Sequence, residues 1–244
     1  MSGRTTMSRL RRFPTAILIV ILAATSVAGG LTLAPPVSAQ EVGDPAEQLL
    51  MDAAERMLGY QTMKFDLVYE KGSTNLFTGI KMTKASGAIE RPGKMEATVQ
   101  SKIGFGKINI KATVIGDKAE VRAVGINEDY TLPSSLAHII ADPVLLLPDL
   151  VGAVENPVVS SIETTKTGAR IIWITGTFNP ALIQDDAVRG YAESLGARPV
   201  DVAINEDGLI SSVRIGGSFV SYDSNDVVRR LDIYGYGEPV DISG

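Results

Sequence analysis

Polar and apolar residues alternate along the chain from residue 63 onward, and this period of two predicts β-strands. Met63, Phe65 and Leu67 are apolar, whereas Lys64 and Asp66 between them are charged. The same alternation returns in four later segments: 80–83, 95–100, 107–114 and 119–124. Strands with one apolar and one polar face indicate an antiparallel meander that is solvated on one side. We therefore expect the polar residues of these strands to face water: Lys64, Asp66, Glu70, Lys81, Glu96, Gln100, Lys107, Lys111, Glu120 and Arg122.

A helical period precedes the strands. Asp44 is a good N-cap, Pro45 suits the first helical position, and Glu47 can close a capping box. Apolar residues then recur at helical spacing as far as Gly59, which favours a helix end. The spacing predicts an amphipathic helix over residues 44–58.

After residue 142 the pattern changes again. The apolar run Val144–Val154 predicts short helical pieces, and Asn179-Pro180 predicts a helix that runs to about Leu195. Strands are predicted over the remaining segments: 157–164, 169–178, 199–204, 209–215 and 227–234. The expected fold class is mostly β (α+β), with one strongly curved antiparallel sheet of roughly ten strands and three helical insertions over its apolar face.

The N-terminal segment has the features of a secretory signal peptide. Four arginines precede the apolar run Ala16–Leu33, and the first acidic residue is Glu41. Val37 and Ala39 are small residues at the −3 and −1 positions of a cleavage site. We therefore expect residues 1–39 to be a signal peptide and residues 40–244 a single domain that is secreted or stays in the cell envelope. The alternative is an uncleaved anchor, because the apolar run is long enough to span a bilayer.

Charge and cysteine content narrow the classes of function. The formal net charge is −5, and it becomes −9 once the four arginines of residues 1–39 are removed. Such an acidic chain does not suit nucleic acid, whose phosphates need clustered Lys and Arg. Adhesion to an anionic membrane through charge is disfavoured too, so we expect only transient membrane contact. The chain contains no Cys, which excludes disulfides and the Cys-linked lipid anchor of bacterial lipoproteins.

The residue types that most enzyme mechanisms use are scarce. The chain has no Cys and one His, His138, which leaves no Cys nucleophile, Ser-His-Asp triad or zinc cluster to expect. The adjacent acids Asp185-Asp186 and Glu206-Asp207 are expected to be solvated, on a helix and in a hairpin turn respectively. We therefore expect no enzymatic activity, no cofactor and no metal. A hydrolase that uses only carboxylates is the least favoured alternative.

Several short stretches, taken in order and spacing, resemble the LppX/LprG family of cell-envelope lipoproteins. They are Phe65–Glu70, Ala88–Met95, Val114–Ala119, Asp142–Leu146, Val227–Asp232 and Glu238–Val240. The resemblance implies a half-open β-barrel with helices over its concave side, similar to that of LolA and LolB. It also implies that an acylated lipid or glycolipid is bound in the hollow and carried in the cell envelope, with an envelope transporter as a partner. The chain departs from the family by lacking the Cys that holds the lipid anchor.

A hollow that binds acyl chains must be dry, because each exposed CH₂ group costs about 0.8 kcal/mol. We expect the inward strand residues to line it: Phe65, Leu67, Ile80, Met82, Val99, Ile108, Ile110, Val114, Val121, Ile172 and Ile174. Leu145, Leu146 and Leu150 of the middle helical segment are expected to form a lid. The alternation alone is equally compatible with a filled core. The alternative function is an adaptor domain with a vestigial cavity, whose partner is another envelope protein. We expect a monomer.

The first prediction concerns export. Because Ala39 ends a signal peptidase site, N-terminal sequencing of the exported protein should begin at Gln40. Recovery of the protein only in the membrane, with residues 1–39 retained, would instead identify this segment as an anchor.

Overall fold

The computed structural model describes residues 44–243, apart from residues 78–79, 104–105, 134–136, 138–139, 141, 187, 190–195, 219–222 and 224–225. Its strands are β1 (Thr62–Lys71), β2 (Thr74–Phe77), β3 (Ile80–Glu90), β4 (Lys94–Ile103), β5 (Gly106–Ile115), β6 (Lys118–Ala123), β7 (Ile126–Thr131), β8 (Val154–Thr164), β9 (Arg170–Phe178), β10 (Arg198–Ile204), β11 (Ile210–Gly216) and β12 (Val228–Tyr234). All of them belong to one antiparallel sheet.

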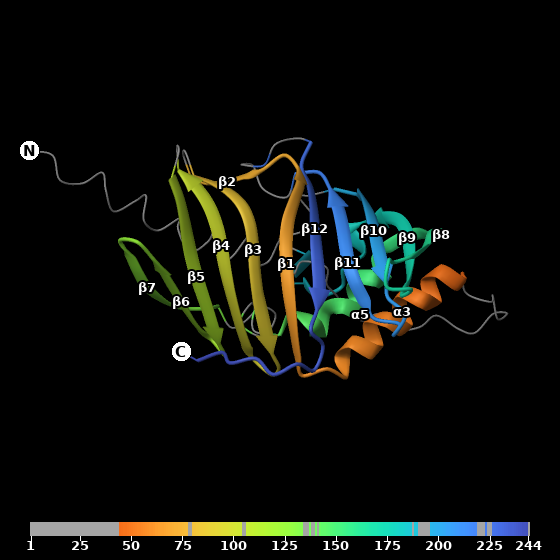
Figure 1. The fold of residues 1–244 in the computed structure, drawn as a ribbon, viewed down its shortest axis with the longest axis horizontal. Helices are drawn as coiled ribbons and strands as arrows, with labels where there is room; N and C mark the ends of the chain where they lie inside the picture. The colour runs from red at the N-terminus through yellow and green to blue at the C-terminus, as the bar shows by residue number, and fades with distance from the viewer. Residues whose placement is uncertain are drawn as a thin grey trace, which may run out of the picture.

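The sheet consists of two meanders that the first and last strands join. Its order is β7-β6-β5-β4-β3-β1-β12-β11-β10-β9-β8, and β2 pairs with β3 beside this path. β1 pairs with β12 so that Phe65 lies opposite Ile233 and Leu67 opposite Leu231. In the described part of the chain β7 and β8 have no second neighbour, so the sheet is open rather than closed into a barrel (Figure 1). The expected fold class is confirmed.

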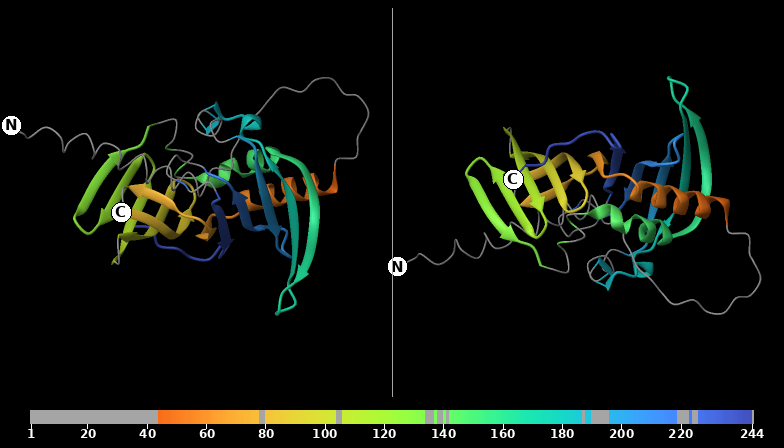
Figure 2. Two further views of the ribbon diagram at one scale, coloured as in Figure 1. Left: turned by 90° about the horizontal axis from the view of Figure 1, so that it is seen from above. Right: turned by 90° about the horizontal axis from the view of Figure 1, so that it is seen from below.

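Helix α3 (Pro45–Leu58) and the middle segment η1 (Pro143–Leu146) with α5 (Leu147–Gly152) lie on the concave side of the curved sheet (Figure 2). The helix predicted over 44–58 is confirmed, since the Ala46 N–H donates to Asp44 Oδ1 at 2.9 Å and caps its first turn. One face of α3 buries Leu50, Ala53 and Met57. This face contacts α5, β8 and β11, so the helix closes one end of the concave side.

The third predicted helical insertion is interrupted. Asn179 Oδ1 accepts from the Ala181 N–H at 3.2 Å, but the 3₁₀ turn η2 (Pro180–Leu182) ends at once because Ile183 is extended. A new helical turn begins further along, where the Val188 N–H donates to Asp185 Oδ1 at 3.0 Å. The break places the Ile183 side chain in the core, where it is 1% exposed. Tertiary burial therefore overrides the local helical pattern, and residues 187 and 190–195 lie outside the described residues.

Two strands were not predicted from the sequence. β2 has only four residues, and β7 is largely polar, so neither shows a clear alternation. Both are held by the backbone of a neighbouring strand, β2 by β3 and β7 by β6.

The faces of the predicted strands are assigned correctly. None of the ten polar residues expected to face water is buried: Glu70, Lys81, Gln100, Lys107 and Lys111 are exposed, and Lys64, Asp66, Glu96, Glu120 and Arg122 are half-buried. Lys111 Nζ lies 2.7 Å from the Glu96 carboxylate, which shows how neighbouring strands pair their charges on this outer face.

Gly87 makes room for an aromatic ring in the concave face. It lies directly opposite Phe65 in the β1–β3 ladder. A Cβ at position 87 would lie 2.1 Å from the Glu96 carbonyl oxygen and 2.7 Å from Phe65 Cζ. The absence of a side chain therefore lets the ring of Phe65 cover this part of the sheet.

We predict that Gly87→Ala lowers the free energy of unfolding by about 1–3 kcal/mol, because the methyl group overpacks a site closed by backbone. Gly152→Ala is the matched control, since no heavy atom lies within 4 Å of a Cβ there. It should change stability by less than about 0.5 kcal/mol. Urea denaturation measures both, and equal stability of the two variants would contradict the close approach of Phe65.

Candidate functional site

An apolar cavity lies between the concave face of the sheet and the helices that cover it. Its sides are β1, β3 and strands β8–β12, with α3 at one end and η1 and α5 above. Every residue that lines it is apolar: Met57, Met63, Phe65, Ile89, Pro143, Val144, Leu147, Leu150, Val151, Val154, Phe178, Val200, Val202, Ile210, Val213, Ile215, Leu231 and Ile233. A polar ligand would find no hydrogen-bond partner among these side chains, so the cavity suits only an apolar group.

The cavity has a volume of about 60 Å³. Pockets for small-molecule ligands usually measure about 300–1,000 Å³. The η1–α5 segment, which we call the lid (Pro143–Gly152), packs against the concave face and leaves little free space beneath it. Val144 and Leu150 of the lid are 2% and 1% exposed, so they are buried as deeply as the sheet residues beneath them.

An ion pair holds the start of the lid. The Nε of Arg91, in the turn between β3 and β4, donates to Asp142 Oδ1 at 2.7 Å and to Oδ2 at 2.9 Å. The Arg91 and Asp142 side chains are only 14% and 8% exposed. Arg91 Nη1 also donates to the Leu58 carbonyl oxygen at 2.6 Å, at the end of α3. One guanidinium thus ties the sheet, α3 and the lid together.

This ion pair joins two stretches that the sequence singled out separately. Arg91 belongs to Ala88–Met95, and Asp142 opens Asp142–Leu146. The two residues are 51 positions apart, and no hydrophobic period connects them. The signal that could have linked them is chemical: each is a charged residue next to a proline at the edge of an apolar run.

The acidic residue of the lid, Asp149, is half-buried. Burial raises the pKa of its carboxyl above the ordinary value, and the nearby charge of Asp185 raises it further. Both effects disfavour the ionised form in the folded protein, so the Asp149 carboxylate adds no stability at neutral pH.

The residues that were expected to line a hollow lie in different parts of the structure, and only some of them line the cavity. Phe65 and Leu150 line the cavity. The others that are buried pack elsewhere in the core: Leu67, Met82, Val99, Ile110, Val114, Val121, Leu146 and Ile174. Ile108 and Ile172 are half-buried, Leu145 is 51% exposed, and the side chain of Ile80 lies outside the described residues. Which of these side chains contact a ligand stays a prediction.

The sequence suggested Met57 and Met63 as lining residues, and both line the cavity, but it missed the residues that the C-terminal strands bring there. Val202 and Val213 are examples. Their strands had been predicted, and so had the helix. Which part of the concave face stays hollow depends on where α3 and the lid dock, however, and periodicity does not contain that information.

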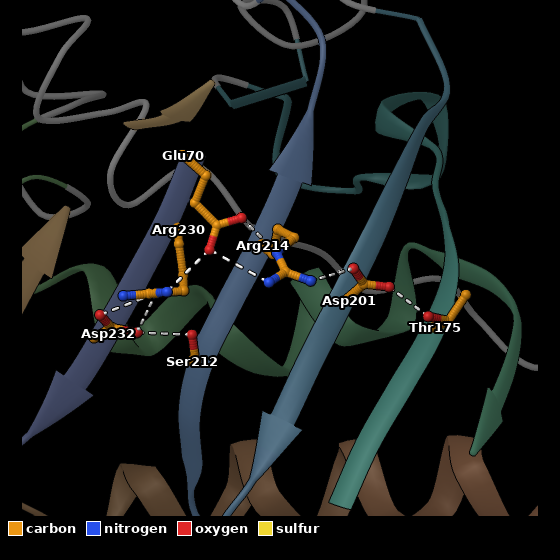
Figure 3. Close-up of polar contacts among 7 residues, drawn as sticks. All are labelled: Glu70, Thr175, Asp201, Ser212, Arg214, Arg230 and Asp232. Atoms are coloured by element: carbon orange, nitrogen blue, oxygen red, sulfur yellow. Dashed lines mark hydrogen bonds and ion pairs between the residues drawn. The ribbon is translucent and has the colours of Figure 1, made fainter. Parts of the chain in front are cut away.

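The outer face of the same strands carries a polar network (Figure 3). Glu70 accepts from Arg214 Nε at 2.8 Å and from Arg230 Nη1 at 2.9 Å. Arg230 Nε also donates to Asp232 at 2.9 Å, and Arg214 reaches Asp201, which accepts from Thr175. The hydrogen bonds to Glu70 and Asp232 raise the pKa of Arg214 and Arg230 respectively. Two guanidinium groups thus lie between three carboxylates across β1 and β10–β12, and these contacts stabilise the register of the sheet.

Among the described residues, no group of three or more His, Cys, Asp or Glu side chains is placed to hold a metal ion. Within the same residues no helix has the length and apolar character needed to cross a membrane.

We predict that Asp142→Ala destabilises the protein by about 3 kcal/mol, because it leaves the largely buried Arg91 without its acid. Asp66→Ala is the control: its partner Lys84 lies 2.9 Å away, but these side chains are 27% and 36% exposed. Its loss should cost less than about 1 kcal/mol. Denaturation gives both values, and hydrogen exchange should show faster exchange in the lid only for Asp142→Ala. Similar small losses for the two variants would show that the buried pair does not hold the lid.

Comparison with known proteins places the fold. No protein-family model matches the sequence, and no curated protein matches it. The structure is similar to that of LprF from Mycobacterium bovis, with 16% sequence identity and a TM-score of 0.56 over 82% of this chain and 96% of that chain. Two further structures align too weakly to carry an argument. MucB in complex with MucA(peri) has 14% sequence identity and a TM-score of 0.34, over 80% of this chain and 57% of that chain. A LolA superfamily protein from Nitrosomonas europaea has 9% identity and a TM-score of 0.30, over 80% of this chain and 94% of that chain. At this identity the likeness to LprF concerns the fold alone, and it confirms the fold that the resemblance to the LppX/LprG family implied.

Proposed function

We propose that the protein binds the acyl part of a lipid or acylated glycolipid in the apolar cavity and carries it within the cell envelope. The observation that carries this proposal is the lining of the cavity, in which every residue is apolar. A ligand that fits such a lining must itself be apolar over the part that enters, and acyl chains are the commonest apolar groups in an envelope.

Binding requires the lid to move, because the closed cavity of about 60 Å³ is too small for an acyl chain. Each CH₂ group that leaves water contributes about 0.8 kcal/mol, so a chain of ten or more carbons can supply roughly 8 kcal/mol toward displacing Val144 and Leu150 from the sheet. The polar headgroup would stay at the rim, since the cavity offers it no partner. The closed state is then the unloaded form of the carrier, which it adopts after release and before the next uptake.

The carrier role explains the absence of catalytic groups near the cavity. Transfer of a lipid breaks no covalent bond, so a binding surface and a movable lid are sufficient. The adjacent acids Glu206 and Asp207 lie in the exposed turn between β10 and β11, and neither lines the cavity. Glu206 lines a separate pocket beside α3, so chemistry at that carboxylate would take place outside the apolar cavity.

We predict that Val213→Phe fills the cavity and weakens acyl binding at little cost in stability. Val213 lines the cavity and is 8% exposed. Val99→Phe is the matched control: Val99 is 1% exposed on the same concave face but does not line the cavity. The control should lose about 1–3 kcal/mol of stability through overpacking, while its folded fraction still binds.

Two measurements test this prediction. Native mass spectrometry of protein purified from an exporting host should show co-purified acyl mass, and a fluorescent fatty-acyl probe should bind the delipidated protein. Both signals should fall in Val213→Phe and persist in Val99→Phe, Asp185→Ala and Glu206→Ala. Unchanged probe binding in Val213→Phe, with loss of binding in one of the acid variants, would reject the cavity as the binding site.

A further inference from the structure

Strand β8, at one edge of the open sheet, exposes apolar side chains along most of its length. Val158, Val159 and Ile162 are 53%, 43% and 54% exposed. All side chains from Val158 to Thr164 are exposed, on both faces of the sheet. The β8–β9 hairpin projects beyond the rest of the sheet (Figure 2). In the described part of the chain β9 is the only strand that pairs with β8, so its outer backbone groups are open to another strand.

The opposite edge of the sheet is protected by a different composition. β7 has six residues, and Glu128 and Asp129 stand at its centre. β8 has eleven residues, and from Val158 to Thr164 its one charged side chain is Glu163. Soluble proteins usually protect a sheet edge with charge, short length or proline, and β7 follows this rule. β8 has Pro157 near its start and bulges at 155–158 and 159–161, but it is nearly twice as long as β7 and its exposed part carries one charge.

The chemistry of an edge strand decides between a membrane and a protein as the partner. A bilayer would cover the apolar side chains of β8 but would leave its outer N–H and C=O groups without partners, at several kcal/mol for each group. A second strand satisfies both the side chains and the backbone. The open edge therefore favours a polypeptide.

The charges of the hairpin favour a second copy of this chain in antiparallel orientation. Glu155 lies at the start of β8, whereas Lys166 and Arg170 lie at the tip of the hairpin. In an antiparallel pair the tip of one copy meets the start of the other, so opposite charges come together at both ends. A parallel pair would bring like charges together.

The side chains in the middle of β8 fit the same two-fold arrangement. Val159 pairs with Ile174 of β9 and Ile162 pairs with Ile172, and a bulge between Val159 and Ser161 places both apolar residues on the concave face. When a two-fold axis passes between Ser160 and Ser161, Val159 of one copy lies opposite Ile162 of the other copy on the concave face. We propose that two copies of the protein associate through antiparallel pairing of their β8 strands, which makes one continuous sheet. The monomer that the sequence alone leads us to expect is the opposite outcome of the test below.

The test is the oligomeric state of the purified protein, as its host processes it, over a dilution series in sedimentation experiments. Wild-type protein should sediment as a monomer–dimer equilibrium. Ile162→Lys, a change at an exposed position, should raise the dimer dissociation constant by at least about tenfold, because it places a charge at the edge. Val124→Lys is the matched control: Val124 is 92% exposed between β6 and β7, and its change should leave the equilibrium unaltered.

A charge exchange tests the orientation. Glu155→Lys should weaken the dimer about threefold to tenfold, and Glu155→Lys combined with Lys166→Glu should restore it. A monomer at every concentration, assembly into larger species, or equal effects of Ile162→Lys and Val124→Lys would each overturn the proposal. Failure of the charge exchange to restore the dimer would overturn the antiparallel register. None of these results depends on lipid binding, which the Val213→Phe variant tests separately.

Discussion

The ion pair between Arg91 and Asp142 is a directional contact that fixes where α3 and the lid lie on the concave face of the sheet. Burial of apolar surface is favourable but non-directional, so it does not by itself fix where a short helical segment settles on a broad apolar face. The bifurcated hydrogen bond from Arg91 Nε, at 2.7 and 2.9 Å from the two carboxylate oxygens, fixes the position of residue 142 relative to the β3–β4 turn. The same guanidinium also donates to the Leu58 carbonyl oxygen, so it positions the C-terminal end of α3 together with the start of the lid.

The ion pair places the lid over the cavity without filling the space beneath it. A core packed to the usual density has no voids larger than a water molecule, whereas the space under Leu150 and above Val213 measures about 60 Å³. Such a void costs stability, and the ion pair keeps the lid in register above it. On the outer face, the charges around Glu70 and Arg214 hold the strands beneath the cavity in alignment without entering it.

The period of two was sufficient to predict most of the strands and their faces, because one face of each strand meets water and the other does not. Capping chemistry predicted α3, since Asp44 and Pro45 act locally. The cavity was harder to place, because its position is set by where helices dock and by a contact between residues 51 positions apart. Fully buried residues such as Val99 and Ile110 carry the same alternating pattern as Phe65, yet they belong to the packed part of the core.

The pairing of the first strand with the last has a consequence for how the chain acquires its shape. β1 has β3 on one side, but its other neighbour, β12 (Val228–Tyr234), follows it in sequence by more than 150 residues. During synthesis or passage across a membrane the two meanders can form separately, but they cannot join until the final strand is available. Contacts so distant in sequence slow folding, since a long loop must close before they form. The sides of the cavity need both β1 and β12, so the cavity cannot be complete before these two strands have paired.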